Sequence, residues 1–241
     1  MSRPPESKTL DDKRPGVYIK LPGVQILLNG PLSVIALLIL LAVIVGIFYL
    51  VVTRTGPAQW ASGGLWIAFI LYWSVAAQNS AVTRSSESLQ SRQIHQLLMY
   101  GALLMALLPL PGLRQRWLPI LPRVGVPVGL AIQVSSALLA IWARQHLGKN
   151  WSGAITSKVD HQLIRTGPYK MLRHPIYSGM LGMFLGTAVV SGELHGLVGL
   201  LIISVAYWRK ITLEEEYLRG TFGIEYDDYR KKSWAVIPGL L

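Results

Sequence analysis

A run of 22 residues without a charged side chain, at positions 31–52, is the feature that most restricts the fold of this 241-residue chain. A helix rises 1.5 Å per residue, so about 20 residues cross the roughly 30 Å apolar core of a bilayer. Only 15% of the residues are charged, whereas soluble domains carry about 25%. The run predicts a membrane-spanning helix, and the composition predicts an integral membrane protein.

Further apolar segments follow at 60–77, 97–110 and 126–142. The segment 175–208 is too long for one crossing, and Ser191-Gly192-Glu193 offers a break that would make it a helical hairpin. We therefore expect an all-α fold, a polytopic membrane helix bundle of five or six transmembrane helices. Its expected parts are an N-terminal tail (1–30), N-terminal transmembrane helices (31–142) and a C-terminal core (143–241).

The distribution of charge predicts how the bundle is oriented. With six spans, 19 of the 23 Lys and Arg residues fall on one side of the membrane, which places both termini and the 144–174 loop in the cytoplasm. The net charge of +11 is spread over loops, which favours a lipid bilayer over nucleic acid as the partner. A prokaryotic cytoplasmic membrane is the expected location. The absence of cysteine excludes disulfides and thiolate chemistry.

Residues 173–180 read RHPIYSGM and stand at the start of an apolar run. Pro175 fits the first position of a helix, which puts His174 at the cap beside free backbone N–H groups and the positive end of the helix dipole. Together with Arg173, this arrangement predicts a place for an anion. Gly179 and Gly182 thin one helix face, either for a flat ligand or for tight packing of another helix.

Three adjacent carboxylates, Glu214, Glu215 and Glu216, follow the last apolar segment. They form either a solvated helix face, in which Lys210 pairs with Glu214 and Arg219 with Glu215, or a site for an ammonium group or ribose hydroxyls of a ligand. The sequence leaves both interpretations open.

Four motifs occur in order over the C-terminal half: H-x-L at 161–163, G-x-Y at 167–169, R-H-P-x-Y-x-G at 173–179 and E-E-x-x-L-x-x-x-F-G-x-x-Y-x-x-Y at 214–229. Taken together they resemble the isoprenylcysteine carboxyl methyltransferases, their prokaryotic relatives and the related phospholipid N-methyltransferases. The resemblance implies an integral membrane methyltransferase that uses S-adenosylmethionine, held in a cytoplasmic pocket formed by the C-terminal half, and it implies no metal. Carried over by motif, the cofactor-binding residues are His161, Leu163, Tyr169, His174, Tyr177, Gly179, Glu214 and Glu215.

The same resemblance implies a lipophilic acceptor, which is a small molecule, a lipid or a prenylated chain. The expected reaction is carboxyl O-methylation of an isoprenylcysteine-like substrate, with N- or S-methylation as close variants. For the acceptor carboxylate, Arg173 is the first candidate for an orienting cation and Lys232 the second. Lys232 stands where the eukaryotic enzymes carry an arginine.

Two alternatives come from other classes of protein. Membrane sterol reductases that use NADPH have a similar R-H-P-x-Y-x-G stretch, but the acidic run at 214–216 argues against a polyanionic nucleotide. A non-catalytic interaction subunit would use the same residues as interfacial anchors.

Overall fold

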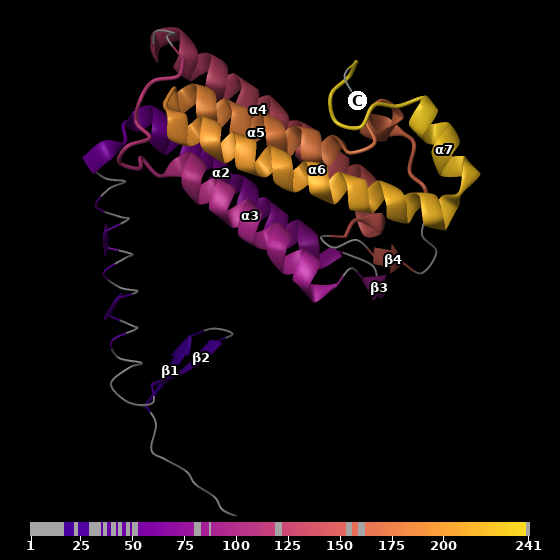
Figure 1. The fold of residues 1–241 in the computed structure, drawn as a ribbon, viewed down its shortest axis with the longest axis horizontal. Coiled ribbons are helices and arrows are strands. Elements are labelled where there is room, and N and C mark those ends of the chain that lie inside the picture. The colour runs from indigo at the N-terminus through magenta and orange to yellow at the C-terminus, as the bar shows by residue number, and fades with distance from the viewer. Residues whose placement is uncertain are drawn as a thin grey trace, which may run out of the picture. The chain divides into compact units, whose positions relative to one another are not determined.

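The structure is a computed structural model. It describes residues 17–21, 24–28, 53–79, 83–86, 88–118, 122–152, 156–158 and 162–239, with a few helical residues between 35 and 49 (Figure 1). The chain divides into two compact units, Met1–Tyr49 and Leu50–Leu241.

The first unit contains a two-stranded antiparallel sheet of β1 (Val17–Leu21) and β2 (Val24–Leu28). Val17 lies opposite Leu28, and Leu21 lies opposite Val24. Of the predicted span at 31–52, only scattered residues are described, and these are helical. The rest of this predicted span lies outside the described residues.

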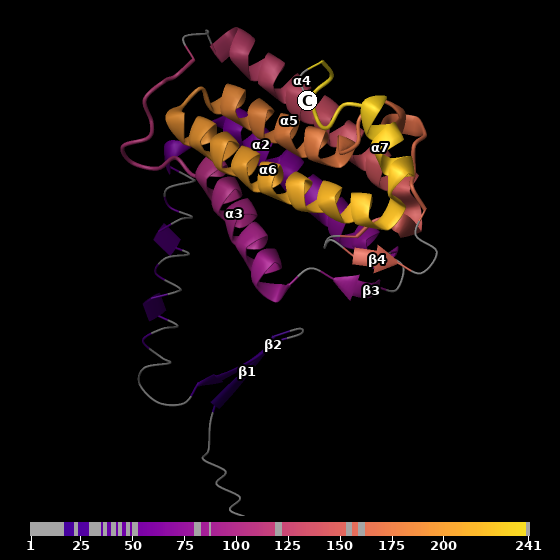
Figure 2. The same ribbon diagram turned by 45° about the vertical axis from the view of Figure 1, so that its right-hand side comes forward.

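The second unit is a helical bundle, which confirms the helical architecture predicted from the sequence (Figures 1 and 2). Its α-helices are α2 (Pro57–Ala76), α3 (Leu89–Leu107), α4 (Pro122–Leu147), α5 (Pro175–Ser191), α6 (Leu194–Phe222) and α7 (Ile224–Lys231). Short 3-10 turns are η1 (Ala77–Asn79), η2 (Gly148–Asn150) and η3 (Gly167–Lys170). A second antiparallel pair, β3 (Thr83–Ser86) with β4 (Thr156–Lys158), joins the α2–α3 connection to the segment after α4. The all-α prediction did not include these short strands.

Local capping explains where the helices begin. Pro57 and Pro175 occupy first-turn positions of α2 and α5, where no N–H is needed. The Ser88 side chain accepts a hydrogen bond from the Ser91 N–H at 3.2 Å, which starts α3 eight residues before the predicted apolar segment at 97.

The predicted hairpin is confirmed at Gly192. This residue adopts the left-handed conformation (φ 62°) and donates its N–H to the Ala188 carbonyl at 2.9 Å, which closes α5. The chain reverses there into α6, so α5 and α6 lie side by side (Figures 1 and 2).

Close contact between α4 and α5 depends on glycines along both helices. A Cβ placed at Gly179 would lie 2.6 Å from the Ser136 carbonyl oxygen, and one at Gly186 would lie 2.6 Å from the Gly129 carbonyl oxygen. Since these distances are far below van der Waals contact, only glycine permits this approach.

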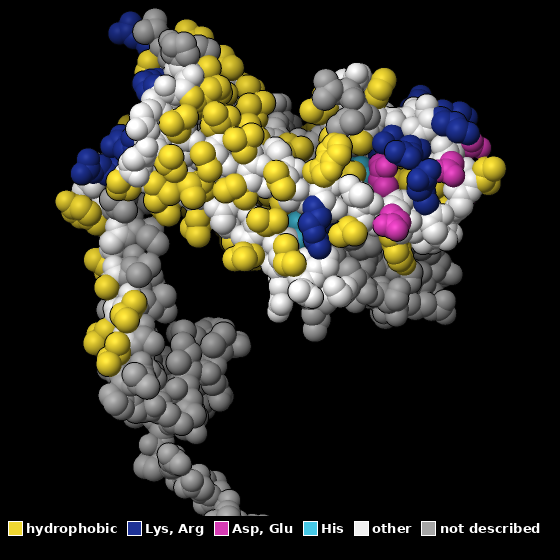
Figure 3. Space-filling view, viewed as in Figure 1, with side chains coloured by type: hydrophobic (Ala, Val, Ile, Leu, Met, Phe, Trp, Pro, Cys, Tyr) yellow, Lys and Arg dark blue, Asp and Glu magenta, His cyan; other side chains and the backbone are white. Residues whose placement is uncertain are grey.

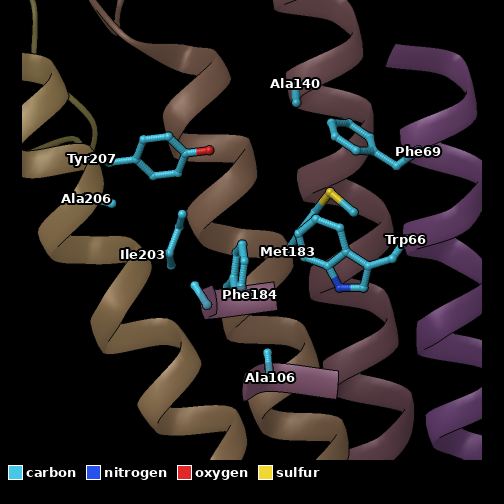
Figure 4. Close-up of a cluster of buried hydrophobic side chains, with 10 residues drawn as sticks. Trp66, Phe69, Ala106, Ala140, Met183, Phe184, Ile203, Ala206 and Tyr207 are labelled. Carbon is cyan, nitrogen blue, oxygen red and sulfur yellow. The ribbon is translucent and has the colours of Figure 1, made fainter. Parts of the chain in front are cut away.

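The core lies where α2, α4, α5 and α6 meet, and it also receives Ala102 and Ala106 of α3 (Figure 4). Trp66 and Phe184 pack edge to face, with ring centroids 4.8 Å apart. Two hydrogen bonds between buried side chains link three helices within this core. Ser62 of α2 donates to Gln133 of α4 at 2.9 Å, and Trp66 of α2 donates to Thr187 of α5 at 2.9 Å.

Two of the described helices, α4 and α6, are long and apolar enough to cross a membrane by length and composition, and α5 is a shorter apolar helix. On the face shown in Figure 3, apolar side chains cover the middle of the bundle, and acidic side chains gather near the end that carries α7. The number of crossings predicted from the sequence, five or six, stays a prediction.

Candidate functional site

The start of α5 is built as predicted, with His174 at the cap and Pro175 in the first turn. The backbone N–H groups before the helix, however, already have partners. Arg173 donates to the Trp234 carbonyl at 2.7 Å and His174 donates to the Ala235 carbonyl at 2.9 Å. The C-terminal segment therefore pairs with the backbone of Arg173 and His174, and the place for an anion at the first turn of α5 stays a prediction. This pairing could not be anticipated from local sequence, because the two segments are distant in the chain.

Arg173 and Glu215 form a buried ion pair, with 2.7 Å between Nε and Oε1 and side chains that are 7% and 12% exposed. Arg173 also donates to the backbone carbonyls of Arg230, at 3.2 Å, and Ser233. Glu215 is further contacted by His174 Nε2 at 3.3 Å and by Arg230 Nε at 3.3 Å. Both members of the pair are thus occupied by the protein itself.

Glu214 differs from its neighbour because its carboxylate lines a cavity. The Tyr177 hydroxyl donates to Glu214 Oε2 at 2.8 Å, and His174 Nδ1 lies 3.8 Å from the same oxygen. The ring of His174 stacks on that of Tyr177, with centroids 5.5 Å apart. The rings of His174, at the cap of α5, and of Tyr177, in its first turn, therefore contact one carboxylate of α6 at the wall of the cavity.

The cavity has a volume of about 460 Å³ and extends along α5 from His174 to Phe184, which is about 15 Å of helix. Its polar part carries Arg173, His174, Tyr177 and Glu214. Its apolar part is lined by side chains of α2, α3 and α5, namely Trp66, Phe69, Trp73, Met99, Leu103 and Phe184. A volume in this range suits a small organic ligand, and the two-part lining suits one polar and one apolar ligand group.

Tyr169 and Tyr229 tie the loop before α5 to α7. The Tyr229 hydroxyl donates to the Tyr169 carbonyl at 2.6 Å, and both side chains line the cavity. Burial raises the pKa of Tyr229 to about 12 and raises the pKa of Tyr169 as well. Both phenols are therefore neutral at physiological pH, and the Tyr229 hydroxyl keeps its proton to donate.

The predicted site residues divide into three groups. Leu163, Tyr169, Arg173, His174, Tyr177 and Glu214 line the cavity. Gly179, Glu215 and Lys232 are not among its lining residues within the described part of the chain: Gly179 packs against α4, Glu215 pairs with Arg173, and Lys232 is exposed. His161 lies outside the described residues.

The cavity wall also contains residues that sequence reasoning did not assign to the site, among them Lys210 and Tyr226. Lys210 is only 4% exposed and lines the cavity one helical turn before Glu214. The spacing of four between them was visible, but it was interpreted as a possible solvated ion pair. Tyr226 is fully buried and also lines the cavity, and only its place in the F-G-x-x-Y pattern signalled it.

Comparison of the sequence with known proteins identifies relatives of the C-terminal half of the chain. Residues 124–225 match the family model described as "Phospholipid methyltransferase". A protein-S-isoprenylcysteine O-methyltransferase of Schizosaccharomyces pombe is 38% identical over 97 residues, which are 38% of this chain and 40% of that protein. One of Dictyostelium discoideum is 30% identical over 116 residues, 47% of this chain and 49% of that protein. The chain thus matches less than half the length of either relative.

A solved structure shares the fold. It is that of a eukaryotic intramembrane Ras methyltransferase, an isoprenylcysteine carboxyl methyltransferase, with a TM-score of 0.52 and 20% sequence identity over 78% of this chain and 70% of that chain. These matches confirm the resemblance on which the four motifs were interpreted.

Proposed function

Because residues 124–225 are related to the isoprenylcysteine and phospholipid methyltransferases, we propose that this protein is an integral membrane methyltransferase. It uses S-adenosylmethionine and methylates the carboxylate of a lipophilic, isoprenylcysteine-like acceptor. The observation that carries the proposal is a cavity in which a charged part adjoins an aromatic and apolar part. The methyltransferase names of the matched relatives favour it over a reductase or a non-catalytic subunit.

The polar part of the cavity fits S-adenosylmethionine, whose ammonium, carboxylate and ribose hydroxyls need partners of both signs. Glu214, held by Tyr177, would receive the ammonium or ribose hydroxyls, and Leu163 and Tyr169 would border the nucleoside. When bound, the cofactor supplies a methyl group activated by the positive charge of its sulfonium. His161, from the H-x-L motif, is proposed for the same pocket by the resemblance alone.

The residues of this chain would contribute positioning rather than acid–base chemistry. A carboxylate acceptor is already ionised, so its methylation needs alignment and the exclusion of water. The aromatic walls from α2 and α5 exclude water from the apolar part. Lys210, a buried cation in the cavity wall, is a further candidate beside Arg173 for orienting the acceptor carboxylate. Arg173 itself holds Glu215 and two backbone carbonyls. Lys232 is exposed and outside the cavity wall.

The proposed topology places the charged part of the cavity and both termini in the cytoplasm. The excess of Lys and Arg on that side supports this orientation. A water-soluble donor would reach the polar part from the cytoplasm, while a prenylated chain or lipid would reach the apolar part from the bilayer.

A labelled methyl donor tests the proposal. Purified protein in lipid nanodiscs is incubated with S-[methyl-³H]adenosylmethionine and N-acetyl-S-farnesylcysteine, and base-labile methyl ester is counted. We expect ester formation with this acceptor and background counts with the matched carboxamide, which lacks the reacting carboxylate. Equal counts with both acceptors, or binding of no adenosyl ligand by folded protein, would refute the proposal.

A lipid amine is the second candidate acceptor, favoured by the description of the matching family model. An amine must lose a proton during methylation, and His174, held by Glu215 at its Nε2, offers a ring nitrogen near the cavity. Supplying phosphatidylethanolamine in the same assay and counting base-stable label would distinguish N-methylation from ester formation.

A further inference from the structure

Tyr226 carries a hydroxyl group without a hydrogen-bond partner among the residues that the structure describes. The side chain is 0% exposed and forms part of the cavity wall. Two other tyrosines of the same wall are satisfied, since Tyr177 donates to Glu214 at 2.8 Å and Tyr229 donates to the Tyr169 carbonyl at 2.6 Å. Tyr226 is therefore the exception within one cluster of phenols.

The position of the Tyr226 ring is fixed by the fold of α7. Gly223 turns the chain with φ 54°, so that α7 folds back and buries Tyr226 and Tyr229. The two rings pack edge to face, with centroids 6.1 Å apart. Because the ring is held on its apolar faces, packing alone explains an aromatic residue here but not the hydroxyl.

A buried hydroxyl that makes no hydrogen bond destabilises the folded protein, and phenylalanine would keep the same packing without that cost. The free-energy cost of burying the Tyr226 hydroxyl is offset only if another group forms a hydrogen bond with it. Arg173 and Glu214, which belong to the polar part of the cavity, line the same cavity as Tyr226. A ligand group beside the Tyr226 hydroxyl would therefore be polar.

We propose that the Tyr226 hydroxyl makes a hydrogen bond to the amino-acid end of the bound methyl donor. This inference rests on the proposed function, in which the donor occupies the polar part of the cavity. A phenol can donate to a carboxylate and accept from an ammonium, so it matches either charged group of that end. Tyr226 is thereby assigned as a ligand-binding residue and not as a structural aromatic.

The test compares Tyr226→Phe with its neighbour Tyr229→Phe in detergent-purified full-length protein. Two ligands are titrated by calorimetry: S-adenosylhomocysteine, which has the amino-acid end, and 5′-methylthioadenosine, which lacks it. The unfolding temperature of each variant is measured without ligand. We expect Tyr226→Phe to weaken S-adenosylhomocysteine binding by about fivefold to thirtyfold, to change methylthioadenosine binding by less than about twofold, and to unfold at the wild-type temperature or above.

The control variant behaves differently under the proposal. Tyr229→Phe removes the donor to the Tyr169 carbonyl, so it lowers the unfolding temperature but leaves the ratio of the two ligand affinities unchanged. Wild-type affinity of Tyr226→Phe for S-adenosylhomocysteine, or an equal loss for both ligands, overturns the inference while the proposed function stands. If folded wild-type protein binds neither ligand, the proposed function itself fails and the inference falls with it.

Discussion

Arg173 and Glu215, 42 positions apart in the sequence, meet as a buried ion pair that joins the start of α5 to the C-terminal half of α6. The same guanidinium holds the backbone of the C-terminal segment through Ser233. One side chain thus fixes three parts of the chain around the polar part of the cavity.

Removing Arg173 should destabilise the protein strongly. Arg173→Gln leaves Glu215 buried with fewer partners, which costs about 3–5 kcal/mol in comparable buried pairs, and should lower the unfolding temperature measured in detergent. The control is Arg219→Gln, which breaks an exposed pair with Asp227 (2.9 Å) and should change the unfolding temperature little, because water and salt screen an exposed pair. A similar small effect for both variants would mean that the buried pair does not hold the site together.

Glu214 and Glu215 should separate into a binding role and a structural role. Glu214→Gln removes the carboxylate of the cavity wall and should weaken S-adenosylhomocysteine binding about tenfold or more, with little change in unfolding temperature. Glu215→Gln should lower the unfolding temperature because Arg173 and Arg230 lose their shared partner. Calorimetric titration and thermal unfolding of both variants give the comparison, and a reversed pattern contradicts the assignment.

Lys210 should govern the acceptor and not the donor. Lys210→Met removes a buried cation of the cavity wall and should lower kcat/KM for a farnesylcysteine carboxylate by about 10- to 100-fold, with S-adenosylhomocysteine affinity retained. Lys231→Met, which alters an exposed lysine paired with Asp228, is the matched control and should act as wild type. Equal loss of donor affinity in Lys210→Met would show that the residue serves the donor instead.

Gly179 should tolerate no side chain. Gly179→Ala forces a Cβ against the Ser136 carbonyl of α4, and such overpacking costs about 1–3 kcal/mol. Gly63→Ala in α2 is the control, since nothing lies within 4 Å of its added Cβ, and alanine there should be neutral or stabilising by up to about 1 kcal/mol. Unfolding temperatures of the two variants check the difference. Loss of ligand affinity without loss of stability in Gly179→Ala would instead favour the ligand-facing interpretation of this glycine.

Stability should fall at alkaline pH in part through Tyr229. Its pKa is raised by burial from 10 to about 12, so the folded state binds this proton more tightly than the unfolded state does. The stabilisation is fully present below pH 10 and is lost as pH rises toward 12, by about 2–3 kcal/mol for a shift of this size. Unfolding followed from pH 9 to 12 should show a steeper decline for wild type than for Tyr229→Phe, and parallel declines would exclude this contribution.

Local sequence signals predicted the hairpin and the start of α5 because each depends on one residue with a fixed conformational preference. Gly192 supplies a left-handed turn and Pro175 fits the first helical turn. The start of α3 was misplaced because residues 89–96 are polar, and the Ser88 cap that begins the helix was not weighed.

The sequence predicted most of the residues that form the site, but it did not predict the role of each one. The sequence motifs predicted that Arg173, His174, Tyr177 and Glu214 belong to one site. All four side chains line the same cavity. The sequence did not show that Arg173 is already paired with Glu215, because the two residues are 42 positions apart and no local pattern encodes that pairing. Likewise, the sequence alone does not show whether a ligand or another helix contacts a glycine such as Gly179.

The hydrogen bonds of Ser62 with Gln133 and of Trp66 with Thr187 restrict how the bundle can change shape. An axial slide of α2 past α4 or α5 would break these buried hydrogen bonds. These three helices therefore act as a rigid frame. Helix α3, which packs mainly on α6, is not tied into this frame by either of the two hydrogen bonds.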